Sequence, residues 1–129
     1  MAGFVPYFSY RDAGAALDWL ETAFGFERTQ EYRDDSGTVV HAELRFGDGS
    51  IMLGSGEPPA PEPGRARETS PRAHGVYAVV DDVDAAHERA VAAGAHVVYP
   101  PEETEFGTRR FRALDLEGYE WSFGSYAPG

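Results

Sequence analysis

The residues best suited to chemistry in this sequence are a histidine and two glutamates. His41 and Glu43 alternate along one strand-like stretch, and Glu120 lies in a similar stretch near the other end of the chain. Imidazole and carboxylate groups can hold a divalent metal or transfer a proton. The simpler alternative is structural, because His41 and Glu43 share a polar strand face with Arg45 and would form cross-strand charge pairs there. Both interpretations stay open at this point.

Other catalytic templates are absent from the sequence. The chain has no cysteine, which excludes disulfides, thiolate metal sites and a cysteine nucleophile. It contains no glycine-rich phosphate loop, no nucleophile elbow and no HExxH helix. Serine and histidine residues occur only at scattered positions, so no catalytic residue is assigned.

The composition narrows the range of partners. Among 129 residues there are 22 acidic and 11 basic ones, every basic one an arginine, and the formal net charge is −11. The electrostatic field of such a negative charge repels phosphate backbones and anionic lipids. This argues against nucleic-acid and membrane partners and favours cationic ligands. The simpler alternative is that the acidity only keeps the protein soluble. The N-terminal segment lacks the basic and apolar regions of a secretion signal, so a cytoplasmic location is predicted.

The sequence repeats itself at an offset of 70 residues, which indicates that one structural unit occurs twice. The identical pairs are Tyr7/Tyr77, Asp12/Asp82, Ala15/Ala85, Ala16/Ala86, Ala23/Ala93, Gly37/Gly107, Thr38/Thr108, Leu44/Leu114, Gly54/Gly124 and Ser55/Ser125.

Each half begins with a β-prone run, continues with a helix and ends with three strand-like stretches. Asp12 and Asp82 suit the N-caps of the two helices, and Gly25 and Gly94 suit their C-terminal ends. The predicted strands are Val5–Tyr10, Arg28–Tyr32, Val39–Phe46 and Ser50–Leu53, then Val76–Val80, His96–Tyr99, Arg109–Leu114 and Glu120–Phe123. The pattern predicts an α+β protein made of two tandem βαβββ modules.

The two modules are joined by a segment rich in proline. Residues 54–73 hold five prolines and no apolar periodicity, so we interpret this segment as a linker, with a flap over a site as the alternative. The chain is predicted to be a single domain over residues 1–129. Module one covers residues 4–55, the linker 56–73 and module two 74–126.

Several segments resemble the vicinal-oxygen-chelate superfamily, which includes glyoxalase I, extradiol dioxygenases, epimerases and bleomycin-resistance proteins. They are VPYFSYRDAGAALDWLETAFGF (5–26), HAEL (41–44), VDDVDAAHERAVAAGA (80–95) and FGTRRFRALDLEGYEWSF (106–123). HAEL and the Trp-Ser ending resemble an uncharacterised glyoxalase-like subgroup most closely. The resemblance covers nearly the whole chain. One departure is the turn Asp115-Leu116-Glu117-Gly118, which lacks the proline that the family places after the aspartate.

The resemblance implies that each module curls into half of a cup and that paired modules enclose an open cavity. In many members the paired modules come from two chains, so a homodimer is implied. Metal-dependent members place four ligands on the first and last strands of the modules. The matching positions here are Val5, Met52, Gly75 and Ser122. These side chains do not suit a hard or borderline cation, so we expect no metal and no cofactor.

A displaced metal site is the alternative to this expectation. His41, Glu43 and Glu120 are its best candidate ligands, and Glu120 keeps the strand parity of Ser122. His74 lies one residue from Gly75 and would point to the opposite face, because side chains alternate along a strand.

Period-two alternation, with rim positions added, predicts the lining of the cup. The predicted ligand-binding residues are Tyr7, Ser9, His41, Glu43, Met52, Tyr77, Phe106, Arg109, Phe111, Glu120 and Ser122. This lining is aromatic and apolar with few acids, which suits a flat or hydrophobic molecule.

The sequence thus favours a metal-free protein that binds a small molecule. We expect it to sequester a planar or hydrophobic, neutral or cationic compound such as an antibiotic, as bleomycin-resistance proteins do, and not to be an enzyme. One alternative is a glyoxalase-like lyase, isomerase or dioxygenase that uses the displaced metal site or acid–base residues. Another is a sensory or scaffolding module.

Overall fold

The chain forms two compact units, one within Met1–Ala60 and one within Pro61–Gly129. The structure is a computed structural model that describes residues 3–56 and 75–128. His74 and the predicted linker beyond Gly56 lie outside the described residues. No helix in the described part of the chain is both long enough and apolar enough to cross a membrane.

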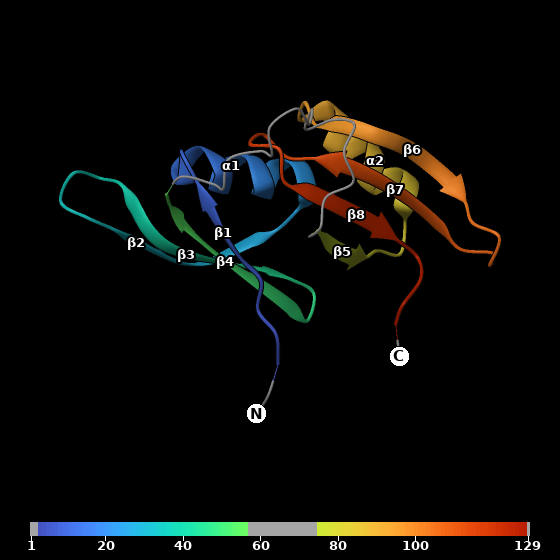
Figure 1. Cartoon of the computed structure of the whole chain (residues 1–129), viewed down its shortest axis with the longest axis horizontal. Helices are drawn as coiled ribbons and strands as arrows, with labels where there is room; N and C mark the ends of the chain where they lie inside the picture. The colour runs from blue at the N-terminus through green and yellow to red at the C-terminus, as the bar shows by residue number, and fades with distance from the viewer. Residues whose placement is uncertain (1–2, 57–74, 129) are drawn as a thin grey trace, which may run out of the picture. The chain divides into compact units, whose positions relative to one another are not determined.

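The first unit is a helix packed on a four-stranded mixed sheet (Figure 1). Its elements are β1 (Tyr7–Tyr10), α1 (Ala13–Phe24), β2 (Glu27–Arg33), β3 (Val39–Phe46) and β4 (Gly49–Ser55). The strand order in the sheet is β1-β4-β3-β2. Strand β1 runs parallel to β4, and the other neighbouring pairs are antiparallel.

The second unit has the same topology. Its elements are β5 (Val76–Val79), α2 (Val83–Ala92), β6 (His96–Glu103), β7 (Arg109–Leu114) and β8 (Glu120–Gly124). Its strand order is β5-β8-β7-β6, again with one parallel pair, β5 and β8. The predicted α+β fold with two βαβββ modules is confirmed, and neither sheet is closed.

Both helices begin directly after the predicted N-cap aspartates. The carboxylate of Asp12 accepts a hydrogen bond from the Ala15 N–H, and that of Asp82 accepts one from the Ala85 N–H, each at 3.0 Å. Each bond satisfies one of the N–H groups that a helix leaves unpaired in its first turn. Gly25 ends α1 in the left-handed conformation, at a φ of 75°, as the sequence predicts.

Strand β6 is longer than the sequence predicts. The predicted strand ends at Tyr99, whereas β6 continues through Pro100 and Pro101 to Glu103. An edge strand tolerates proline because one row of its N–H groups needs no partner, and irregular pairing with β7 accompanies the two prolines.

The core of each unit lies between its helix and one face of its sheet. In the first unit, Leu17 and Leu20 of α1 are buried together with Leu44 and Leu53 of the sheet. In the second unit, α2 buries only Val83 and Ala90, and the sheet supplies the large side chains. The buried side chains on the helix-covered face of this sheet are Phe111, Ala113, Trp121 and Phe123.

A buried aspartate closes the turn between β7 and β8. One carboxylate oxygen of Asp115 accepts hydrogen bonds from the N–H groups of Glu117 and Tyr119, each at 3.0 Å. The other accepts one from the Trp121 indole N–H at 3.0 Å. Asp115 therefore organises a turn that lacks the family's proline, and it also satisfies the polar atom of a core tryptophan.

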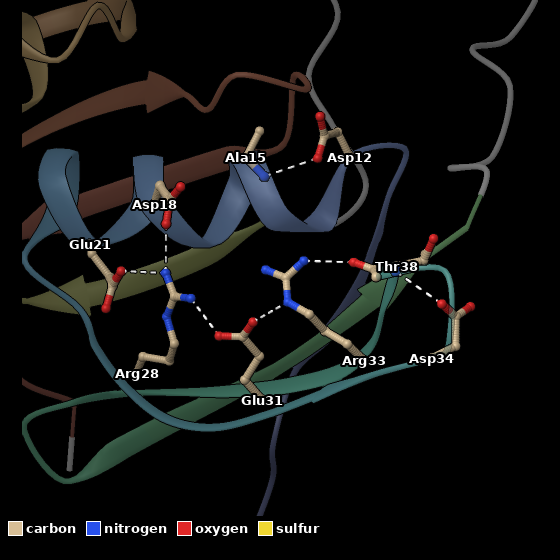
Figure 2. Close-up of polar contacts among 10 residues, drawn as sticks. Asp12, Ala15, Asp18, Glu21, Arg28, Glu31, Arg33, Asp34 and Thr38 are labelled. Atoms are coloured by element: carbon tan, nitrogen blue, oxygen red, sulfur yellow. Dashed lines mark hydrogen bonds and ion pairs between the residues drawn. The ribbon is translucent and has the colours of Figure 1, made fainter.

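Helix α1 is tied to β2 by an arginine that contacts three carboxylates (Figure 2). Arg28 donates to Asp18 and Glu21 of α1 and to Glu31 of β2, at 2.6 to 2.8 Å. Arg33 also donates to Glu31. Hydrogen bonds from Arg28, and secondarily from Arg33, hold the pKa of the Glu31 carboxyl below its ordinary value. This network lies on the helix side of the sheet and is structural.

Candidate ligand-binding site

The sheet face away from the helix carries most of the predicted ligand-binding residues. Residues directly opposite each other on neighbouring strands share a face. In the first unit Met52 lies opposite both Tyr7 and Glu43. In the second unit Ser122 lies opposite both Tyr77 and Arg112. The alternation that buries Leu53 and Phe123 against the helices leaves these side chains on the open faces.

A small cavity lies on the open face of the first unit. It has a volume of about 230 Å³, and Tyr7, Ser9, His41 and Met52 all line it. Ligand cavities for drug-sized molecules are typically about 300 Å³ or larger. Four predicted residues thus come together, but the space they enclose holds only a small group.

The imidazole of His41 is paired with a carboxylate. Its Nε2 lies 2.8 Å from Oε2 of Glu43, and both side chains are a little more than one-third exposed. A carboxylate in this position orients the imidazole ring. Both residues lie on β3, so the arrangement can serve as an acid–base pair or as a polar contact along one strand. The charge pair that crosses strands on this face joins Arg45 of β3 to Glu27 of β2 at 2.6 Å.

A larger cavity lies in the second unit, where the turn between β6 and β7 meets the segment that follows β8. Its volume of about 730 Å³ falls within the range of cavities that accept a drug-sized molecule. Its lining residues are Tyr77, Glu103, Thr104, Glu105, Phe106, Thr108, Arg109, Arg110 and Tyr126. Three of these, Tyr77, Phe106 and Arg109, belong to the predicted set.

The other lining residues were not predicted from the sequence, for identifiable reasons. Tyr126 follows the last strand, and outside a strand the alternation of side chains no longer predicts which way a residue points. The turn at Thr104 could have been found from the repeat. Thr104 accepts hydrogen bonds from the N–H groups of Phe106 and Thr108, whereas its counterpart Asp34 binds Ser36 and Thr38. The same turn therefore places Phe106 at its tip.

Acidic groups outnumber basic ones around the larger cavity. Arg109 donates two hydrogen bonds to Asp84, at 2.9 and 2.8 Å, and one to Glu103 at 3.3 Å. Arg110 donates to Glu102 at 3.4 Å. The Arg109 guanidinium holds the pKa of the Asp84 carboxyl below its ordinary value. The lining itself holds two carboxylates, Glu103 and Glu105, and two guanidinium groups. Asp84 and Glu102 add two carboxylates beside the lining, so the surroundings of the cavity favour a cation over an anion.

Glu120 and Ser122 lie on the open face of the second unit but are engaged by an arginine. Arg112 donates to Ser122 Oγ at 3.0 Å and to Glu120 at 3.4 Å. The guanidinium carbons of Arg110 and Arg112 also lie 5.2 and 5.3 Å from the centre of the Tyr99 ring. This part of the face is a cation–π cluster, of which only Arg110 also lines the larger cavity.

Phe111 does not face a cavity, which corrects its predicted place. It is fully buried, stacks on Phe123 with ring centres 5.1 Å apart, and meets His87 of α2 edge to face. Phe111 pairs directly with Phe123 in the sheet and must share its helix-covered face. The open side of β7 is occupied by Arg110 and Arg112.

The four family metal positions do not offer a suitable donor set. Val5 and Gly75 provide no ligand atom, and Met52 provides only a thioether. The hydroxyl of Ser122 accepts a hydrogen bond from Arg112, whose positive charge would repel a metal ion there. Among the described residues, no three His, Cys, Asp or Glu side chains form a group that could hold a metal.

Comparison with known proteins identifies relatives over nearly the whole chain. The family model for the glyoxalase/bleomycin resistance protein/dioxygenase superfamily matches residues 7–123. An uncharacterised protein of Mycobacterium bovis is 30% identical over 124 residues, which are 92% of this chain and 80% of that protein.

Solved structures agree with this match. The crystal structure of TioX from Micromonospora sp. ML1 is 32% identical, with a TM-score of 0.75 over 99% of this chain and 98% of that one. The fosfomycin resistance protein FosX from Mesorhizobium loti is 17% identical and shares the fold, with a TM-score of 0.70 over 98% of this chain and 92% of that one.

Proposed function

Because the chain belongs to the glyoxalase/bleomycin resistance protein/dioxygenase superfamily, we propose that it binds and sequesters a small molecule without the help of a metal. The ligand we propose is planar or hydrophobic, and neutral or cationic, as an antibiotic can be. The observation that carries this proposal is the larger cavity of the second unit, with its aromatic lining and with Asp84 and Glu102 paired to its two arginines.

The cavity supports this class of ligand through its size and lining. Tyr77, Phe106 and Tyr126 present aromatic rings from three separate segments, and Phe106 is 82% exposed. An exposed ring of this size is available for stacking, worth about 0.5–1.5 kcal/mol beyond the burial of its area. Glu103 and Glu105 can meet a positive group on the ligand.

Sequestration needs no chemical step. A protein present in excess over its ligand lowers the free ligand concentration by mass action alone. This role is consistent with family metal positions whose donor set does not fit a divalent ion. The antibiotic class is favoured because bleomycin-resistance proteins give the superfamily part of its name.

Calorimetry against a panel of compounds tests the proposal. The panel contains anthraquinone, glycopeptide and enediyne antibiotics on one side, and glutathione conjugates and small organic acids on the other. We expect binding of planar neutral or cationic compounds that weakens in a Tyr77→Ala variant. Tight binding of an anionic metabolite, lost in Arg109→Ala and unchanged in Tyr77→Ala, would overturn it.

A second candidate is an isomerase or lyase that moves a proton through His41. The observation in its favour is the 2.8 Å contact between His41 and Glu43 beside the smaller cavity. Such a pair is a common general base. The test is the pH profile of any turnover found among carbonyl substrates. Turnover that persists in a His41→Asn variant would exclude this role.

A further inference from the structure

Gly124, at the end of β8, leaves open a space that the ring of Tyr77 fills. A Cβ atom at this position would lie 2.4 Å from the Tyr77 hydroxyl oxygen and 3.0 Å from two carbons of its ring. All three of the nearest atoms belong to Tyr77. The glycine is not needed for backbone conformation, because its φ lies outside the left-handed region. It is needed because a side chain would displace the ring.

The matching glycine of the first unit, Gly54, excludes a side chain for a different reason. A Cβ at Gly54 would lie 2.7 Å from the backbone oxygen of Val40, so the close approach of two strands excludes a side chain there. Tyr7, the counterpart of Tyr77, is 75% exposed, whereas Tyr77 is 40% exposed. The seated tyrosine is therefore a feature of the second unit and of its cavity, and the repeated fold does not require it.

The seated ring also holds the segment that follows β8. The Tyr77 hydroxyl donates a hydrogen bond to the backbone carbonyl of Tyr126 at 2.8 Å. The Ser125 N–H donates to the Arg109 carbonyl at 3.0 Å, and the Arg109 N–H donates to Ser125 Oγ at 2.9 Å. These bonds place Tyr126 against the cavity that it lines.

We propose that Gly124 is a positioning residue for the ligand cavity: it leaves room for the Tyr77 ring, and Tyr77 in turn fixes residues 125 and 126, of which Tyr126 forms one wall of the cavity. This inference rests on the proposed binding function. Because the Tyr77 hydroxyl is engaged by the Tyr126 carbonyl, Tyr77 meets a ligand with the face of its ring. The cavity then selects flat molecules by stacking, with Glu103 and Glu105 favouring a positive charge.

The contact between Gly124 and the Tyr77 ring is tested without any ligand, by a double-mutant cycle on the free energy of unfolding. We expect Gly124→Ala to destabilise the protein when Tyr77 is present and to be nearly neutral in a Tyr77→Ala background. Equal effects in the two backgrounds would show that Gly124 does not seat the ring.

The role of Tyr77 in fixing residues 125 and 126 is tested with Tyr77→Phe, which keeps the ring and removes the hydroxyl. We expect hydrogen exchange of the Ser125 amide to accelerate about three- to tenfold, the usual effect of one lost hydrogen bond. Tyr32→Phe is the matched control, since the Tyr32 hydroxyl donates to Gln30 in the first unit. Unchanged exchange in Tyr77→Phe would overturn this part of the inference.

Acridine orange, a planar cation, serves as the probe of binding. We expect Gly124→Ala to weaken its binding at least tenfold and Tyr77→Phe to weaken it only a few-fold. Equal affinity of Gly124→Ala and the unmodified protein would overturn the positioning role. A third outcome separates the two proposals. If neither the unmodified protein nor any variant binds the dye but the double-mutant cycle is non-additive, Gly124 does position the Tyr77 ring and the proposed ligand class is wrong.

Discussion

The hydroxyl of Tyr77 donates a hydrogen bond to the backbone carbonyl of Tyr126, 49 residues further along the chain. Burial raises the pKa of this hydroxyl, so it remains a donor throughout the neutral range. The bond joins the first strand of the second unit to the segment beyond its last strand, and both residues line the larger cavity.

Removing the exposed ring of Phe106 should weaken ligand binding without affecting stability. Phe106 lies at the tip of a turn and lines the cavity, and its side chain buries little area in the free protein. We expect Phe106→Ala to lower the affinity for a planar ligand about two- to tenfold, measured by calorimetry. Phe4→Ala, which removes an even more exposed ring from the first unit, is the control and should leave affinity unchanged.

Asp115→Asn should destabilise the protein. The amide nitrogen of the asparagine would face the Trp121 indole N–H in place of the oxygen that now accepts from it. A buried donor left without a partner costs about 1–3 kcal/mol, which urea denaturation would measure. Asp48→Asn, in an exposed turn, should change stability by much less. Equal effects of the two substitutions would contradict this account of the turn.

Glu31→Gln should reduce stability only where the carboxylate is charged. Because Arg28 and Arg33 lower the pKa of Glu31 in the folded state, its contribution is present above the ordinary value of 4.5. That contribution is lost as the pH falls through the lower folded-state pKa. Melting temperatures of the variant and the unmodified protein should therefore differ at neutral pH and converge in strong acid. The exposed Glu88→Gln should show no such difference.

Purified protein should carry less than stoichiometric divalent metal. The physical reason is the residue set at Val5, Met52, Gly75 and Ser122, with Arg112 bound to the last of these. Elemental analysis is the measurement. About one metal ion per chain, lost in a His41→Ala or Glu43→Ala variant, would disprove the prediction and support the displaced site.

The protein should be a homodimer. Large apolar side chains are exposed on the first unit, including Phe4, Val5, Tyr7 and Val40, and such surface is commonly covered by a second copy. Light scattering should give about 28 kDa, twice the chain mass of 14.1 kDa. A mass near that of one chain at micromolar concentration would contradict the expectation.

The architecture was predictable because its signals are local. Asp12 and Asp82 cap helices by binding N–H groups three residues away, and β3 and β7 have the predicted bounds. Alternation along β4 and β8 also puts Ile51, Leu53, Trp121 and Phe123 on the buried faces of the two sheets. These features depend on short-range periodicity and on a repeat that shows the same pattern twice.

The arrangement of the candidate site depends on contacts that no local pattern encodes. Phe111 was misplaced because strand pairing with Phe123 decides its face, and pairing register is a property of the sheet. Tyr126 was missed because a hydrogen bond from Tyr77, 49 residues away in sequence, places it. The sequence alone shows which residue types are available, whereas the register of β7 and β8 and the path of the chain after Gly124 decide which of them meet in a cavity.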